Sequence, residues 1–209
     1  MNTNFIITIG RQLGSGGKKI GEILSQKLSI PCYDKELIRL ASQESGLGVE
    51  FFEKMDEKSR HRFFSTFFQF RSGTMENTTT NYLQNEILFK IQSDVIRSLA
   101  ERESCIFVGR CADYILRENP RCLNIFISAD LEDRIRHISQ TMQIEEKEAS
   151  NLVNEMDKKR AGYYNYYSNK IWGMSTSYHL CINSSLLGIE ETADFILSYF
   201  EKFRHLNFS

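Results

Sequence analysis

The sequence predicts an α/β protein built on a five-stranded parallel sheet with helices on both faces. Five short apolar runs have the composition of buried parallel strands. They occupy residues 5–9, 30–33, 105–108, 123–128 and 178–182. Stretches with helical apolar periodicity separate them, as between residues 83 and 99 and again from 189 to 200. Because parallel strands need long crossovers, this alternation favours a parallel sheet.

The first crossover, from residue 10 to 28, carries a glycine-rich loop followed by an amphipathic helix. Glycines at such a turn allow positive φ angles and close approach of the backbone to a ligand. The N–H groups of the loop and the positive end of the helix dipole favour an anion. We therefore predict a phosphate site formed by Gly14, Ser15, Gly16, Gly17, Lys18 and Lys19.

This loop departs from the phosphate-loop pattern G-x-x-x-x-G-K-[ST]. With Gly17-Lys18 as the G-K pair, Gln12 replaces the first glycine and Lys19 replaces the hydroxyl residue. Ser15 is the nearest substitute for that hydroxyl. The alternative is a glycine-rich turn that only joins a strand to a helix.

Asp34 ends the second predicted strand, where α/β folds place ligand-binding residues. It could equally cap the next helix. Seven phenylalanines then lie between residues 51 and 70. This segment could close over a substrate or cover a partner, but packing onto the domain is the favoured interpretation. Residues 72–80 are polar and predict a flexible loop.

Basic residues follow the third and fourth strands. Arg110, after Gly109 at the end of the third strand, offers a planar fork for a phosphate, or is a surface arginine. Asp130 is a predicted helix cap. Further on, Lys158, Lys159 and Arg160 precede a tyrosine-rich stretch. They could close over a phosphoryl group, or form a solvated helix face. The tyrosines favour packing, with base stacking as the alternative.

Composition narrows the class of protein. The 209 residues are 41% hydrophobic and 25% charged, which is typical of a globular chain. A net charge of −1 argues against a nucleic-acid polymer as partner. Five widely spaced cysteines fit reduced thiols rather than zinc ligands, and neither a signal peptide nor a membrane span is recognisable. We therefore expect a cytoplasmic protein.

In order along the chain, the segments RQLGSGGKKIG, IPCYDKELI, FVGRCADYIL, LNIFISADLEDRIRHI, DKKRAGYYNYYSNKIWG and YHLCINSSLLGIEE resemble the cytidylate kinase-like family, relatives of the nucleoside monophosphate kinases. The resemblance implies a three-layer P-loop kinase fold in one domain. It also implies an acceptor-side helical segment at about residues 35–80 and a helical lid at about 140–175.

The same resemblance implies ATP and Mg²⁺ as cofactors, with metal ligands unassigned. Residues 14–19 would hold the donor, and Lys18, Arg110 and Arg160 would act on the transferring group. The acceptor would lie among Asp34, Arg39, Arg110, Arg134, Lys158 and Lys159. Arg110 matches the arginine of the G-R-D motif of cytidylate kinases. In this chain Cys111 stands in place of the aspartate of that motif, and Asp113 lies two residues further on.

The leading functional hypothesis is ATP-dependent phosphoryl transfer to a nucleoside monophosphate such as CMP, or to a similar small acceptor. Phosphoryl transfer needs positioning and cations more than a nucleophile–base pair. The altered motifs favour one alternative, a nucleotide sensor without turnover. The other alternative is a kinase of a non-nucleotide metabolite, since fold does not fix substrate. The sequence is also compatible with a homo-oligomer.

Overall fold

The computed structural model describes residues 4–34 and 79–207. The chain divides into two compact units, one formed by Met1–Lys35 with Leu99–Ser209 and the other by Glu36–Ser98. Arg39, the helix expected after Asp34 and the aromatic segment 51–70 lie outside the described residues. So does most of the loop expected at 72–80. That loop was assigned two residues too many, because helix α5 (Thr79–Arg102) already begins at Thr79.

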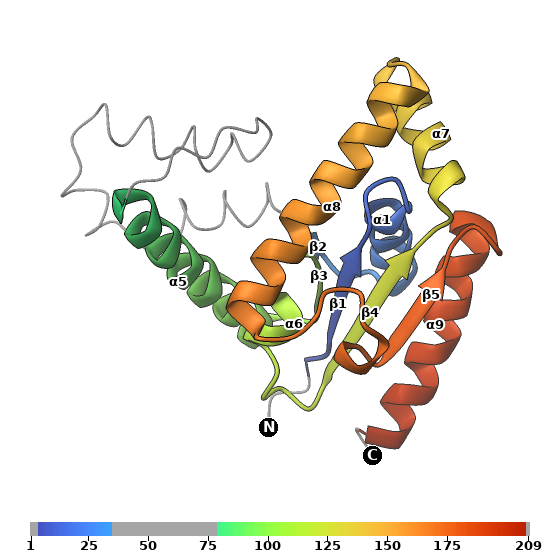
Figure 1. The fold of residues 1–209 in the computed structure, drawn as a ribbon. Coiled ribbons are helices and arrows are strands. Elements are labelled where there is room, and N and C mark those ends of the chain that lie inside the picture. Colours follow the sequence, from blue (N-terminus) through green and yellow to red (C-terminus); the bar gives the residue numbers. More distant parts are fainter. Residues whose placement is uncertain (1–3, 35–78, 208–209) are drawn as a thin grey trace. The chain divides into compact units, whose positions relative to one another are not determined.

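Five parallel strands form one sheet in the order β2-β3-β1-β4-β5 (Figure 1). The strands are β1 (Ile6–Arg11), β2 (Cys32–Tyr33), β3 (Cys105–Val108), β4 (Cys122–Ser128) and β5 (Leu180–Asn183). The predicted sheet is confirmed, with shifts of one or two residues at several strand ends. β1 continues two residues beyond the predicted end because Gly10 and Arg11 pair with β4. β2, an edge strand that pairs only with β3, is shorter than predicted, and β5 begins after Tyr178 and His179.

Besides α5, the helices between these strands are α1 (Gly17–Leu28), α6 (Ala112–Ile115), α7 (Leu131–Met142) and α8 (Glu146–Ser168), with a short 3₁₀ turn at Ser175–Ser177. Helix α9 (Gly188–Asn207) follows β5. Asp130 is the N-cap of α7, as predicted. Its carboxylate, however, makes no capping hydrogen bond and instead accepts one from Asn183 Nδ2 at 2.8 Å.

The main core lies between the sheet and the helices α1 and α9. Alternate residues of β1 face it, so that Ile7 and Ile9 are buried with Leu24 of α1 and Phe200 of α9. On the opposite face, Thr8 donates a hydrogen bond to Asn124 Oδ1 at 2.7 Å. Ring contacts from Phe126 to Tyr178 and from there to Tyr164 place α8 over this second face. Helices therefore cover both faces, as predicted.

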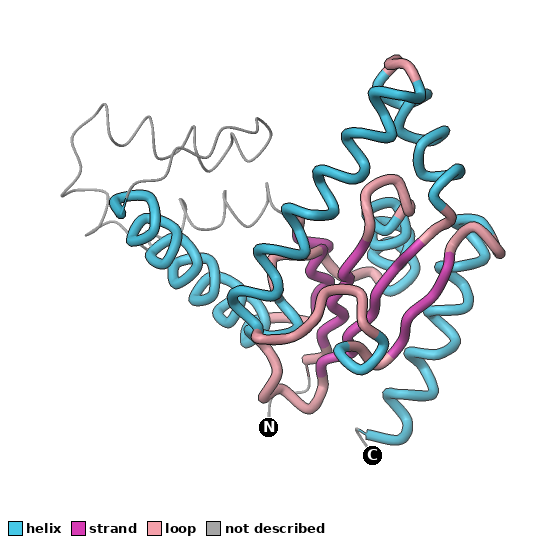
Figure 2. Tube along the Cα trace, viewed as in Figure 1, coloured by secondary structure: helices cyan, strands magenta, loops and turns pink. Residues whose placement is uncertain are grey.

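Helices α7 and α8 form an antiparallel hairpin that rises beyond the sheet (Figure 2). Ile138, Ala149 and Val153 make a separate small core inside this hairpin. Leu13, from the glycine-rich loop, packs against that core. The loop is thus held by the hairpin as well as by the sheet.

Gly16→Ala should lower the free energy of unfolding by about 1–3 kcal/mol, because Gly16 has a φ of 73° and an alanine there would be strained. The new Cβ would also lie 2.9 Å from Ile189 Cδ1. Chemical denaturation measures the change. Gly162→Ala is the matched control, because its new Cβ would meet nothing within 4 Å. This variant should raise the free energy of unfolding by about 0.5–1 kcal/mol. Equal free energies of unfolding for the two variants would contradict the strain expected for alanine at position 16.

Candidate active site

The carboxyl ends of the parallel strands bring three predicted polar residues, Asp34, Arg110 and Asp130, to one edge of the sheet together with Arg11, which was not predicted. Arg11 ends β1, Asp34 follows β2, Gly109 and Arg110 follow β3, and Asp130 follows β4. In an open parallel sheet, this edge is where ligands bind. The residues singled out from the sequence in three different segments are therefore neighbours at one edge.

The glycine-rich loop presents unpaired backbone donors at this edge. Gly14 and Gly16 have positive φ angles of 82° and 73°. Gly16 is the N-cap of α1 and makes no side-chain capping hydrogen bond, so the N–H groups of the first turn keep no intrahelical partner. Such a helix start suits a phosphate oxygen. The geometry fits the nucleotide phosphates that the sequence led us to expect.

The Ser15 hydroxyl is used inside the loop. It is buried and donates to the carbonyl of Gln12 at 2.9 Å, while the Ser15 carbonyl accepts a hydrogen bond from Ser184 Oγ at 2.8 Å. These bonds fix the loop's shape. They do not favour Ser15 as the replacement for the hydroxyl that the phosphate-loop pattern places after its lysine.

Two lysines occupy the first turn of α1, which has no acidic residue to balance them. Positive charge is unfavourable at this end of a helix dipole. Lys18 Nζ lies 2.8 Å from Asp34 Oδ2, and this hydrogen bond raises the pKa of Lys18 above its usual range. Lys19 instead pairs with Glu22 of the same helix at 3.7 Å. The structure thus brings Lys18 and Asp34 together and leaves Lys19 on the helix surface.

The turn after β3 is strained. Gly109, Arg110 and Cys111 have successive φ angles of 79°, 65° and 55°. Left-handed geometry at two non-glycine residues costs free energy, and such strain is concentrated at functional sites. The Arg110 guanidinium lies over the Tyr163 ring of α8, with Cζ 5.0 Å from the centroid, and donates to Tyr163 Oη at 3.4 Å. The strained turn therefore fixes where Arg110 emerges.

Sequence analysis missed Arg11, whose guanidinium lies directly beside Gly109. A Cβ at position 109 would come 1.9 Å from Arg11 Nη1. Burial, together with the charges of Arg160 and Arg110, lowers the pKa of Arg11 to about 9. Arg11 stays charged at neutral pH, while Asp34 and Asp157 offset part of the repulsion. Three crowded arginines favour an incoming anion, because its charge relieves their mutual repulsion.

Asp157 of α8, also missed, connects the hairpin to the loop. One carboxylate oxygen accepts a hydrogen bond from the Leu13 N–H at 2.9 Å, and the other accepts one from Arg134 Nη1 at 2.5 Å. Arg160 Nη1 lies 4.0 Å from the same carboxylate and donates to the Arg11 carbonyl at 3.0 Å. Arg134 is buried, and its Nε has no hydrogen-bond partner among the described residues. Arg134 and Arg160 thus join the edge through Asp157.

The other members of the basic cluster are placed differently. Lys158 is exposed, and Lys159 forms an ion pair with Glu155 one turn earlier. A solvated helix face describes Lys158, whereas Lys159 is half-buried. Asp113 lies in α6, is buried, and accepts the Tyr164 hydroxyl at 2.7 Å. It therefore does not replace the carboxylate missing at position 111.

The described ranges contain no group of three His, Cys, Asp or Glu side chains placed to hold a metal. Mg²⁺ that arrives with nucleotide phosphates needs only one or two protein carboxylates, and Asp34 is the carboxylate beside Lys18. None of the helices among the described residues has the length and hydropathy of a membrane span.

The sheet order, the glycine-rich loop at the start of α1 and the basic edge define a P-loop kinase fold. The family model described as the cytidylate kinase-like family matches residues 6–186, and the chain belongs to this family. Comparison with curated proteins gave no match.

Solved structures agree on the fold. An uncharacterized protein from Eubacterium ventriosum is 28% identical, with a TM-score of 0.72, over 95% of this chain and 99% of that one. A gluconokinase from Sinorhizobium meliloti is 11% identical with a TM-score of 0.57, over 100% and 98% of the two chains. A shikimate kinase from Bacteroides thetaiotaomicron is 16% identical with a TM-score of 0.52, over 94% and 98%. Family and fold together indicate phosphoryl transfer.

Asp157→Ala should lower the free energy of unfolding by about 3–5 kcal/mol, because it leaves the buried Arg134 without its carboxylate partner. Urea unfolding measures the loss. Asp133→Ala breaks the exposed pair with Arg136, whose atoms lie 3.0 Å apart, and should cost less than about 1 kcal/mol. Similar losses in the two variants would show that Asp157 does not anchor the hairpin.

Proposed function

We propose that the protein transfers the γ-phosphoryl group of ATP to a small acceptor that itself carries a phosphate, with a nucleoside monophosphate such as CMP as the leading candidate. One observation carries this proposal. Three arginines gather beside the glycine-rich loop, because Arg160 Nη1 donates to the Arg11 carbonyl at 3.0 Å and the Arg11 guanidinium lies against Gly109, the residue before Arg110. Such a cluster suits a transferring phosphoryl group with a second anion next to it.

On the donor side, ATP bound with Mg²⁺ supplies the activated phosphoryl group. The loop at Gly14–Gly17 and the first turn of α1 hold its phosphates through backbone N–H groups. Lys18 adds a mobile cation that Asp34 keeps charged and oriented. Exchange of the Lys18 ammonium from Asp34 to a phosphate oxygen would free the Asp34 carboxylate for Mg²⁺ or for the acceptor.

On the acceptor side, Arg110 holds the acceptor phosphate through two parallel hydrogen bonds. Arg11 lies between donor and acceptor and neutralises charge at the reacting centre. The α7–α8 hairpin acts as the lid, and Arg160 is its contribution to the site. Positioning and charge neutralisation of this kind are what phosphoryl transfer chiefly requires.

The identity of the acceptor decides between this proposal and its alternatives. A kinase of a non-nucleotide metabolite is one alternative, because a fold does not fix its substrate, and two solved structures of the same fold are described as shikimate kinase and gluconokinase. The absence of a hydroxyl after Lys18 and of a carboxylate directly after Arg110 favours the other, a sensor without turnover.

The decisive experiment is a phosphoryl-transfer screen of the full chain with Mg-ATP. The panel contains all nucleoside monophosphates together with hydroxylated acids such as shikimate and gluconate. Acceptor-dependent formation of ADP with CMP or another nucleotide supports the proposal. Turnover with a hydroxy acid alone supports the metabolite kinase, and ATP binding without any turnover supports the sensor.

Arg110→Lys should raise KM for the acceptor at least tenfold, a loss of about 1.4 kcal/mol, because lysine cannot form two parallel bonds. The affinity for ATP should hardly change. Steady-state kinetics and calorimetric titration with ATP measure the two effects. Arg136→Lys is the control, since Arg136 is exposed and paired with Asp133. Equal weakening of ATP and acceptor binding would move Arg110 to the donor site.

Arg160→Gln should lower kcat at least tenfold, or by about 1.4 kcal/mol of transition-state stabilisation, with a much smaller effect on ATP affinity. The reason is that Arg160 reaches the end of β1, whereas its neighbour Lys158 is exposed. Lys158→Gln should therefore keep kcat within about threefold. If both variants lose the same activity, the hairpin acts only through its overall charge.

A further inference from the structure

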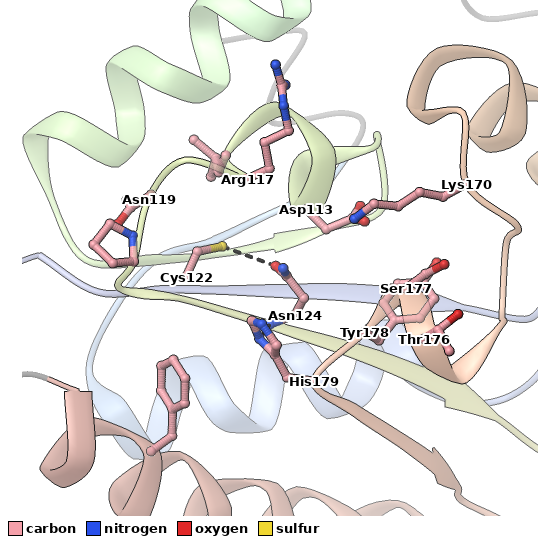
Figure 3. A pocket seen from close by; sticks show the side chains of 13 residues that line it. Asp113, Arg117, Asn119, Cys122, Asn124, Lys170, Thr176, Ser177, Tyr178 and His179 are labelled. Atoms are coloured by element: carbon pink, nitrogen blue, oxygen red, sulfur yellow. Dashed lines mark hydrogen bonds between the residues drawn. The ribbon is translucent and has the colours of Figure 1, made fainter.

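A second cavity lies at the opposite edge of the sheet from the arginine cluster. It has a volume of about 360 Å³, within the range of small-molecule sites. Cys122, the first residue of β4, and His179, directly before β5, both line it (Figure 3). Since the strands are parallel, this is their amino-terminal edge. The phosphate loop and Arg110 lie at the carboxyl edge, so the cavity is separate from the kinase site.

Hydrogen bonds inside the protein leave the cavity lined with donors. Asn124 Oδ1 accepts the Thr8 hydroxyl at 2.7 Å and the Cys122 thiol at 3.2 Å, so the amide oxygen is occupied and the NH₂ group is the side that can serve a ligand. The backbone N–H of Asn124 donates to His179 Nδ1 at 3.0 Å. In the neutral imidazole, the proton therefore sits on Nε2, which is a donor.

Positive charge strengthens this donor character. Lys170 lines the cavity, and its side chain extends toward Asp113 in Figure 3. Desolvation and the Lys170 charge keep the pKa of His179 below its usual range, which keeps the imidazole neutral. The carboxylate of Asp113 already accepts the Tyr164 hydroxyl. A ligand thus meets two neutral donors and an ammonium group, with the Asp113 carboxylate, which also lines the cavity, beside that ammonium.

Beside the polar side chains of Arg117, Asn119, Thr176 and Ser177, the cavity has an apolar wall. Leu116, Pro120 and Phe203 line the cavity, and the Phe203 ring stacks on His179 with centroids 5.9 Å apart. A bare inorganic ion would leave this wall in contact with water. An organic molecule with one or more anionic oxygens would satisfy both the donors and the apolar surface.

We propose that this cavity is a binding site for a small organic anion, a metabolite whose carboxylate or phosphate is held by Lys170, His179 Nε2 and the Asn124 amide. The site stands independently of the kinase reaction. It would exist equally in a sensor and in an enzyme.

Titration of the ¹⁵N-labelled full chain with citrate, and separately with inorganic phosphate, tests the proposal by NMR. Citrate should shift the amide signals of residues 122–124 and 176–179 saturably, with a Kd of about 1 mM or tighter. Phosphate should bind there more weakly, because it leaves the apolar wall uncovered. Signals of residues 11–18 report binding at the kinase site in the same spectra and keep the two sites apart.

Lys170→Ala and Asn124→Asp should each weaken citrate binding at residues 122–124 at least fivefold, about 1 kcal/mol. Asn124→Asp keeps the acceptor for Thr8 but replaces the amide donor by a negative charge. Lys147→Ala, which removes an exposed lysine of α8, is the matched control and should change nothing. Signal dispersion verifies that each variant is folded. Absence of saturable shifts up to about 10 mM citrate, or unchanged affinity in Lys170→Ala, would overturn the proposal.

Discussion

The carboxylate of Asp157 is the contact on which the arrangement of the candidate active site depends. It binds the Leu13 N–H of the phosphate loop and the buried Arg134 of α7, and it lies beside Arg160. A single anion therefore fixes the loop, both helices of the hairpin and two arginines. Without it, Arg134 would be a buried cation with no carboxylate partner, and the loop would lose a bond that orients its first turn. The positions of Arg134 and Arg160 follow from this one negative charge.

Strand-by-strand patterning was enough to predict the sheet, α1 and the position of Arg110, because apolar runs and glycines mark them directly. Arg11 obeys the same rule as Arg110, but it was missed because the apolar run suggested that β1 ends at Ile9. Pairing with β4 extends the strand to Arg11. Asp157 could not be found in this way. Its role arises only when α7 and α8 fold back over the loop, and nothing local distinguishes Asp157 from the other acidic residues of α8.

Local preferences are broken mainly at the candidate active site. Two lysines stand at the positive end of α1, and two non-glycine residues after β3 adopt left-handed geometry. Elsewhere, in the main core, patterning and packing agree, as with Ile7 and Ile9 of β1. Natural sequences concentrate such conflicts where function requires them. The conflicts thus identify the same edge of the sheet as the charge distribution does, by an independent criterion.

Gly109 also limits how this site can change during evolution. The missing Cβ is the space in which the Arg11 guanidinium lies, since a methyl group there would come 1.9 Å from Nη1. A side chain at position 109 would meet the far end of the flexible Arg11 side chain and would have to displace its guanidinium. The two positions, nearly one hundred residues apart in the chain, are therefore tied to one another. Any lineage that acquires a side chain at the first must move the arginine head group at the second, and it also takes on the strain of a φ of 79°.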